Sequence, residues 1–199
     1  MPSDGSVSVP SSLVSLGDYA FGSCGGLKSV EIPASVRELK TQVFLGCTGL
    51  ESVTIPAGVE RIGWASFGYC NALKEIRVDE GNRCFTSVDG VLYTKDRTEL
   101  VACPDTLSEI SILPEVRNIG QCAFLGCYKL TNLTIPEGVT NIAWQGVKDC
   151  PAIKAVTIPS TVRSIATIAF CNCRSLASVT MPQNVTSFGE RVFSSCGSL

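Results

Sequence analysis

The sequence contains no histidine among its 199 residues. Histidine is the usual general base of enzymes and a common metal ligand, so its absence removes His-based triads, His general bases and His metal sites. Glycine-rich phosphate loops, paired metal-binding motifs and nucleophile elbows are also missing. We therefore expect a protein that is not an enzyme, with no catalytic residues, no cofactor, no metal and no small-molecule substrate.

Charge is also scarce, since Asp, Glu, Lys and Arg make up 17% of the chain and the net charge is −2. The Lys and Arg residues are scattered among acids, so no basic patch indicates nucleic-acid binding. No apolar run approaches the roughly 20 residues that a membrane-spanning helix needs. The first residues also lack the basic and apolar regions of a signal peptide. The sequence therefore predicts a partner other than nucleic acid. It also predicts that the chain does not insert directly into a membrane.

What the chain does have is a repeated 23-residue phrase, L-x-x-V-x-I-P-x-x-V-x-x-I-G-x-x-A-F-x-x-C-x-x. A period of 20–50 residues is typical of a solenoid, in which each repeat is one coil and stacked coils share a core. The leading positions of the phrase are Leu27, Leu50, Leu73, Leu107, Leu130, Ile153, Leu176 and Leu199. We expect one elongated domain over residues 1–199 with about eight coils.

The coils differ in regularity. Regular coils are expected at 27–49, 50–72, 107–129, 130–152, 153–175 and 176–198. A weaker coil precedes them at about 4–26, and positions 73–106 form a longer, irregular 34-residue coil. Leu199 would open a further repeat, so we expect the chain to be part of a longer array.

Each regular coil begins with alternating polar and apolar residues, as in residues 28–32 and 51–55, which predicts a strand with one buried face. The proline that follows lacks an N–H group and should end the strand. The apolar residues of G-x-x-A-F-x-x-C are spaced i, i+1 and i+4, which fits about one helical or 3₁₀ turn. Successive strands should form a parallel sheet along one side of the rod.

The phrase resembles the BspA-like leucine-rich repeat. The irregular coil strengthens the resemblance, because residues 82–93 and 100–104 are similar to a divergent repeat common in that family. The resemblance implies an α/β leucine-rich-repeat solenoid, a curved rod that is mostly β with little helix, with a parallel sheet on one side and short helical or 3₁₀ turns on the other. It also implies a surface or secreted protein that acts in adhesion or protein recognition.

Seven of the eleven cysteines share one repeat column: Cys24, Cys47, Cys70, Cys127, Cys150, Cys173 and Cys196. Parallel side chains on adjacent coils provide neither disulfide geometry nor four ligands that converge on zinc, so we expect a column of buried thiols. Cys122 and Cys171 lie outside the column and are the expected reactive thiols. Cys84 and Cys103 flank the irregular coil. Reduced thiols are favoured there, and a bridge is the alternative if the segment folds as a meander that turns at Asp89-Gly90.

We expect partner-binding residues at positions where the sequence departs from the repeated phrase. Trp64 and Trp144 share a column that is polar elsewhere, and tryptophan is enriched at interface hot spots. Since Phe67 is retained beside Trp64, Trp64 is the better candidate for an exposed anchor. Trp144 is expected to fill the volume left by Gly146 and Val147. The two tryptophans lie three coils apart and are not expected to form one patch.

The irregular coil carries a charge cluster on expected turns, and insertions in repeat proteins often mark the binding face. A solvated loop is the alternative. The candidate partner-binding residues are Trp64, Arg77, Asp79, Glu80, Arg83, Lys95, Asp96 and Arg97. The leading hypothesis is a non-enzymatic protein-recognition or adhesion module at the cell surface or secreted. The alternative is an intracellular or organellar scaffold subunit of a larger assembly, which the unpaired thiol column favours.

Overall fold

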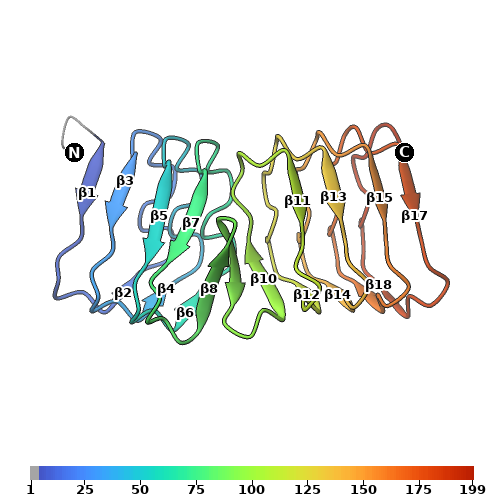
Figure 1. Ribbon diagram of the computed structural model, residues 1–199. Helices are drawn as coiled ribbons and strands as arrows, with labels where there is room; N and C mark the ends of the chain where they lie inside the picture. Colours follow the sequence, from blue (N-terminus) through green and yellow to red (C-terminus); the bar gives the residue numbers. More distant parts are fainter. Residues whose placement is uncertain (1–4) are drawn as a thin grey trace.

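The computed structural model describes residues 5–199, so residues 1–4 of the expected domain lie outside it. In the described range the chain winds as a solenoid of short strands joined by turns, and it contains no helix. The coils follow one another along a rod with the chain ends at opposite ends (Figure 1). The solenoid and its parallel strands confirm the fold expected from the repeated phrase.

The first strand of each coil lies on the front face in Figure 1. These strands are β1 (Ser6–Ser8), β3 (Ser29–Glu31), β5 (Ser52–Ile55), β7 (Glu75–Val78), β11 (Glu109–Ser111), β13 (Asn132–Thr134), β15 (Ala155–Thr157) and β17 (Ser178–Thr180). They pair two by two in parallel, β1 with β3, β5 with β7, β11 with β13 and β15 with β17. The register is one repeat, so that Val7 faces Val30 and Ile110 faces Leu133. Equivalent residues of successive coils therefore form straight columns.

A proline turn leads from each front strand except β7 to a shorter second strand. The Pro33 carbonyl, for example, accepts a hydrogen bond from the Val36 N–H at 3.0 Å. The second strands are β2 (Ser15–Leu16), β4 (Glu38–Leu39), β6 (Arg61–Ile62), β12 (Asn118–Ile119), β14 (Asn141–Ile142), β16 (Ser164–Ile165) and β18 (Ser187–Phe188). They also pair in parallel at the repeat spacing, as Leu39 does with Ile62. The prolines thus end the first strands as the sequence indicates.

The expected helical turn is wrong in detail. The G-x-x-A-F-x-x-C segment, which we call the turn segment (residues 40–47 and 63–70, for example), folds as consecutive tight turns. Two residues four apart have left-handed backbones, with φ of 60° at Gln42 and 72° at Gly46. Left-handed residues interrupt a right-handed helix. They leave alternate N–H groups pointing along the rod, where Gln42 donates to the Trp64 carbonyl (3.0 Å) and Phe44 to that of Ser66 (2.9 Å).

The irregular coil contributes three strands, β8 (Phe85–Val88), β9 (Val91–Thr94) and β10 (Glu99–Ala102). β8 and β9 form an antiparallel hairpin, and β10 pairs antiparallel with β9 and parallel with β12. The hairpin turns at Asp89 and Gly90, both left-handed with φ of 51° and 78°, as a type I′ turn requires. The meander with a turn at Asp89-Gly90, which was the condition for a Cys84–Cys103 bridge, is therefore present. It replaces the turn segment that a regular coil would have here.

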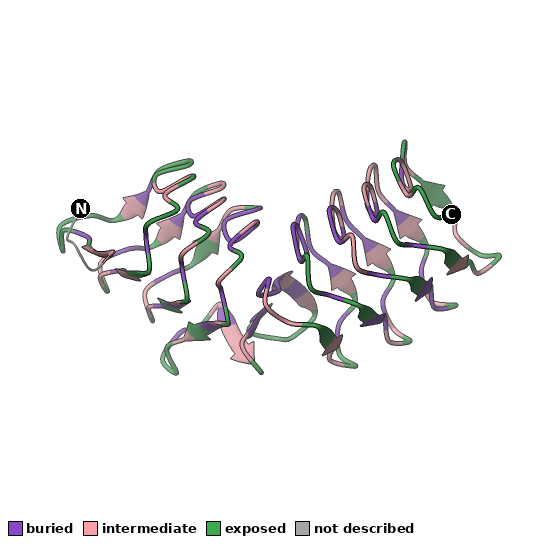
Figure 2. Cartoon of the chain, turned by 90° about the horizontal axis from the view of Figure 1, so that it is seen from above, coloured by how far each residue is buried: buried purple, intermediate pink, exposed green. Residues whose placement is uncertain are grey.

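The hairpin separates two apolar cores. Leu92 and Phe85 pack into the core of the N-terminal coils, whereas Val91 and Tyr93 pack into the core of the C-terminal coils. Since neighbours on a strand point to opposite faces, β9 is buried on both sides. Figure 2 shows the buried residues inside each half and the two halves meeting at an angle at the hairpin.

Five of the seven column cysteines are buried, and their thiols are hydrogen-bonded. Cys70 donates its S–H to the Phe44 carbonyl and Cys150 to the Phe124 carbonyl, both at 3.1 Å and both 26 residues back along the chain. Desolvation by burial raises the pKa of the Cys47 thiol to about 11, so this thiol stays protonated at neutral pH. All eleven cysteines are free thiols, Cys84 and Cys103 included. The structure therefore has reduced thiols where a bridge was the alternative.

Few thiols should react in the native protein. Cys122 is only 4% exposed, so its expected reactivity is wrong, whereas Cys171 is half-buried. A thiol reagent added without denaturant should leave five column cysteines unlabelled: Cys47, Cys70, Cys127, Cys150 and Cys173. All eleven should react in guanidinium. Mass spectrometry of the labelled peptides measures this, and full labelling of the native protein would contradict the buried column.

Candidate functional site

The charge cluster expected in the irregular coil is exposed, and it divides into two groups. Arg77 lies on β7 and forms an ion pair with Glu75 on the same strand. Asp79 follows β7 and accepts a hydrogen bond from the Gly81 N–H at 2.8 Å, which shapes the turn there. Glu80 and Arg83 are exposed on the same connection. This group lies at the end of a front strand.

The second group lies on the turn between β9 and β10. Asp96 accepts hydrogen bonds from the Thr94 hydroxyl (2.7 Å) and from the Thr98 N–H (3.1 Å), and these bonds lower the pKa of its carboxyl group. Arg97 lies 3.9 Å from the Glu115 carboxylate. The Lys95 N–H donates to the Cys84 carbonyl, which places Lys95 beside the segment of Arg83. Asp96 therefore shapes its own turn, while the exposed cations Arg83, Lys95 and Arg97 remain available to a partner.

The two tryptophans meet, contrary to expectation. The Trp64 and Trp144 ring centroids lie 5.4 Å apart with planes at 83°, an edge-to-face contact. Trp64 is 39% exposed, and Trp144 is half-buried against a cluster formed by Ala65, Cys122 and Leu125. Because the irregular coil has no turn segment, residues 63–70 adjoin residues 120–127 directly, and Tyr69 donates its N–H to the Leu125 carbonyl at 3.3 Å. Counting coils along the sequence therefore overestimated the separation.

A pocket of about 390 Å³ opens where the turn segment is missing. One side is formed by residues 62–68. The other side is formed by residues 99–103 of the irregular coil and by the coil that follows it. Trp64 and Gln121 are the exposed residues of its lining, and Glu99 and Asn118 are its half-buried polar residues. We call this the junction pocket.

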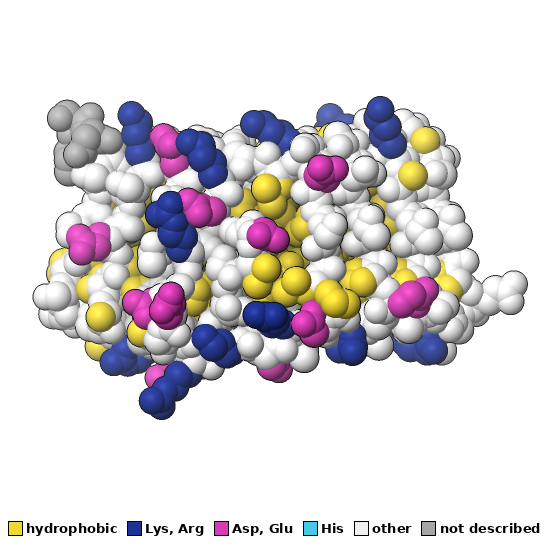
Figure 3. Space-filling view, viewed as in Figure 1, with side chains coloured by type: hydrophobic (Ala, Val, Ile, Leu, Met, Phe, Trp, Pro, Cys, Tyr) yellow, Lys and Arg dark blue, Asp and Glu magenta, His cyan; other side chains and the backbone are white. Residues whose placement is uncertain are grey.

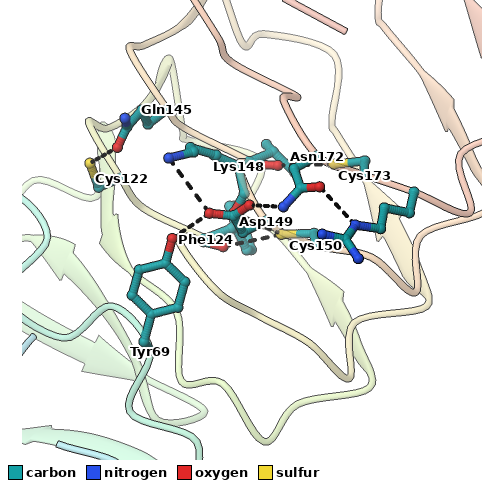
Figure 4. Close-up of polar contacts among 11 residues, drawn as sticks. Tyr69, Cys122, Phe124, Gln145, Lys148, Asp149, Cys150, Asn172 and Cys173 are labelled. Carbon is teal, nitrogen blue, oxygen red and sulfur yellow. Dashed lines mark hydrogen bonds and ion pairs between the residues drawn. The ribbon is translucent and has the colours of Figure 1, made fainter. Parts of the chain in front are cut away.

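A polar cluster next to the pocket ties the two halves together. Figure 4 shows the Tyr69 hydroxyl and the Asn172 side chain pointing at the two carboxylate oxygens of Asp149. Both donate hydrogen bonds to it, and the Lys148 ammonium lies 3.6 Å away. Arg174 in turn donates to the Asn172 side chain at 2.8 Å. Because Tyr69 precedes the hairpin and Asp149 follows it, the cluster fastens a coil of one half to coils of the other.

A second hollow, of about 240 Å³, lies on the front face between the hairpin and β11. Its half-buried apolar side chains are Val88, Leu107, Ile110 and Leu113. The exposed acids Asp89 and Glu109 also line it. Figure 3 shows hydrophobic side chains in the middle of this face, with charged side chains close to them. We call this the front hollow.

β11 borders the front hollow and has only β13 as a strand neighbour within the described part of the chain. The front strand that precedes β11 along the chain is β7, and β7 does not pair with β11. It bonds to the tip of the hairpin, where the Ile76 N–H donates to the Gly90 carbonyl at 2.8 Å. The front sheet is thus interrupted at the irregular coil.

A family model described as a BspA type leucine rich repeat region matches residues 4–89 and 101–199 in six copies. The chain belongs to the BspA-type leucine-rich repeat family. The residues between the two matched ranges are those of β9, its following turn and the start of β10, where the repeat is most altered.

Solved structures of similar proteins agree with this membership of the BspA-type family. The pneumococcal vaccine antigen PcpA is 28% identical with a TM-score of 0.91, and a leucine rich cell surface protein of Faecalibacterium prausnitzii is 26% identical with a TM-score of 0.75. A leucine-rich repeat protein of Eubacterium ventriosum, 21% identical with a TM-score of 0.78, supports the fold alone. Each match covers 98% of this chain but only 49%, 58% and 64% of the respective relative. No curated protein matches the sequence.

One buried ionisable residue of this BspA-type chain is not indicated by the repeat pattern. Asp105 is 2% exposed, its Oδ2 has no hydrogen-bond partner among residues 5–199, and its Oδ1 lies 3.8 Å from the Cys127 sulfur. Desolvation raises the pKa of its carboxyl group to about 8. The equivalent residues Thr48, Asn71 and Tyr128 are exposed, so the column gives no signal that Asp105 turns inward.

Residues 5–199 contain no group of three or more His, Cys, Asp or Glu side chains arranged to hold a metal ion. Nor do these residues include a helix long and apolar enough to cross a membrane.

Proposed function

We propose that the chain is a non-enzymatic protein-recognition module of a cell-surface or secreted protein, and that it acts in adhesion. The observation that carries this proposal is the front hollow, where an interrupted sheet leaves apolar side chains open between Asp89 and Glu109. Apolar patches rimmed by polar residues are typical of protein-interaction sites. Two similar proteins, the pneumococcal vaccine antigen PcpA and the cell surface protein of Faecalibacterium prausnitzii, support the location.

In this proposal the partner contacts the front hollow and the exposed charges on either side of it. Arg77 belongs to the β7 side, with Asp79 and Glu80 at the end of that strand. The cations Arg83, Lys95 and Arg97 flank the open end of the hairpin. Charges at the rim of an interface mainly set the association rate and the choice of partner, whereas the apolar centre supplies affinity.

The test uses the immobilised chain and an array of extracellular-matrix and cell-surface proteins. Glu109→Arg reverses an exposed charge at the front hollow, and Ser178→Arg adds the same charge in the same repeat column on β17. Binding to the protein that wild type retains should weaken at least about tenfold for Glu109→Arg and stay unchanged for Ser178→Arg. Equal binding by both variants would contradict the front hollow as the contact.

Location is tested separately on intact cells of the source organism. A membrane-impermeant label should modify the full-length protein before the cells are broken. Labelling only after lysis would contradict the surface location and would favour the scaffold hypothesis.

A further inference from the structure

The turn segments of this solenoid are held together by a regular hydrogen-bond ladder. In a complete ladder, three alternate N–H groups donate to three carbonyls of the next coil. Those of residues 42, 44 and 46 donate in this way to residues 64, 66 and 68, and those of residues 122, 124 and 126 to residues 144, 146 and 148, at 2.8–3.1 Å. A complete ladder therefore needs a partner backbone on the C-terminal side of the turn segment, and within residues 5–199 the coil of Gln145 lacks only its first bond.

The turn segment of residues 63–70 keeps only the third of these bonds, in which the Tyr69 N–H donates to the Leu125 carbonyl at 3.3 Å. The donors of the other two are the N–H groups of Ala65 and Phe67, and neither has an acceptor within residues 5–199. Both residues are buried, at 5% and 3% exposed, and both line the junction pocket. Buried N–H groups without a partner are rare and costly, so this pair favours a ligand that supplies acceptors.

The opposite side of the pocket offers the complementary group. In neighbouring coils the carbonyl at the position of Gln121 accepts from the coil before it, as the carbonyls of Trp64 and Trp144 do. The Gln121 carbonyl has no donor in the described chain. The pocket therefore presents two backbone donors on one side and one backbone acceptor on the other, which is the pattern that an added strand satisfies.

The pocket also carries a negative charge. Glu99 lines it and accepts a hydrogen bond from the Asn118 amide at 2.7 Å, but no Lys or Arg in the described residues forms an ion pair with it. Ile62, Val101 and Leu125 supply the apolar lining, and Trp64 stands at the exposed side. A basic side chain suits Glu99, and an apolar side chain suits the lining.

We propose that the junction pocket binds a short extended peptide segment of a protein partner, with one apolar and one basic side chain. The peptide carbonyls accept from Ala65 and Phe67, and its backbone replaces the missing turn segment between the two halves. This inference rests on the proposed role in protein recognition and names a second contact for it, separate from the front hollow.

The test is selection of linear heptapeptides from a phage-displayed library on the wild-type chain. Enriched peptides should combine an apolar residue with Lys or Arg. Gln121→Trp fills the exposed side of the pocket and should weaken binding of a selected peptide at least about tenfold. Glu190→Trp places the same side chain in the same repeat column at an exposed position of the last coil and should change nothing. Glu99→Gln should weaken basic peptides while leaving the fold intact.

Amide hydrogen exchange tests whether the peptide binds at the two amides themselves, because an effect transmitted from elsewhere would leave their exchange rates unchanged. In the free chain the Ala65 and Phe67 amides should exchange faster than those of Phe44 and Phe124, and the peptide should slow them at least about tenfold. The proposal is overturned if no peptide is enriched, if Gln121→Trp binds as well as wild type, if the two amides stay unprotected, or if only saccharides bind. If the peptide test fails while the front hollow still binds a protein, the proposed function is unaffected.

Discussion

Replacement of Phe124 with alanine is expected to lower the free energy of unfolding by about 3–5 kcal/mol. Phe124 is fully buried in the C-terminal core, and its backbone joins two coils, with its N–H bonded to the Gly146 carbonyl and its carbonyl bonded to the Cys150 thiol. Removal of the ring leaves a cavity that neighbouring coils cannot close without shifting the ladder. Urea unfolding monitored by circular dichroism measures the change.

Phe188 provides the matched control. It is 54% exposed on β18, so Phe188→Ala should cost less than about 1 kcal/mol. A loss below about 1 kcal/mol for Phe124→Ala as well would contradict a tightly packed phenylalanine column.

The stability of the protein should fall as the pH rises from about 4 to 8, by about 3–5 kcal/mol. The cause is Asp105, whose carboxyl group has a pKa of about 8 in the folded state because burial disfavours its charge. An unfolded aspartate has a pKa of about 3.9. Between these values the folded state keeps a proton that the unfolded state has lost. The stabilisation is therefore complete below the unfolded pKa and is lost as the pH rises through the folded one.

Asp105→Asn should remove most of this slope, because the amide has the shape of the protonated acid and does not ionise. At pH 8 the variant should be more stable than wild type. Asp89→Asn changes an exposed carboxylate at the hairpin turn, leaves Asp105 in place and should keep the slope. Thermal unfolding at several pH values measures all three proteins, and a flat profile for wild type would refute a buried neutral Asp105.

The columns of the solenoid are readable from the sequence because every coil repeats the same packing. Leu27, Leu50 and Leu73 are fully buried, as their spacing predicts. Asp89-Gly90 turns the hairpin because Asp-Gly is a favoured pair for the two positive φ values of a type I′ turn. The conformation of the turn segments was harder to predict, because apolar spacing of i, i+1 and i+4 suits a helical turn and a pair of tight turns equally well.

The junction was not readable for a different reason. The contact of Trp64 with Trp144, the inward Asp105 and the unpaired amides of Ala65 and Phe67 all follow from one missing turn segment. An alignment of the repeats shows that the irregular coil is longer than the others, but not which side of the coil the chain leaves empty. That depends on the pairing of β10 with β12, a contact between strands that belong to different coils.

The two cores on either side of β9 also bear on how the chain unfolds. In a uniform array each coil depends only on its neighbours, and unfolding can spread from coil to coil without a preferred boundary. Here the N-terminal and C-terminal coils each keep a core of their own, joined by the hairpin, the Tyr69–Asp149 hydrogen bond and a few backbone contacts. The protein should therefore open as two cooperative units, which native-state hydrogen exchange would resolve as two classes of protected amides; a single class would show that the hairpin couples them into one.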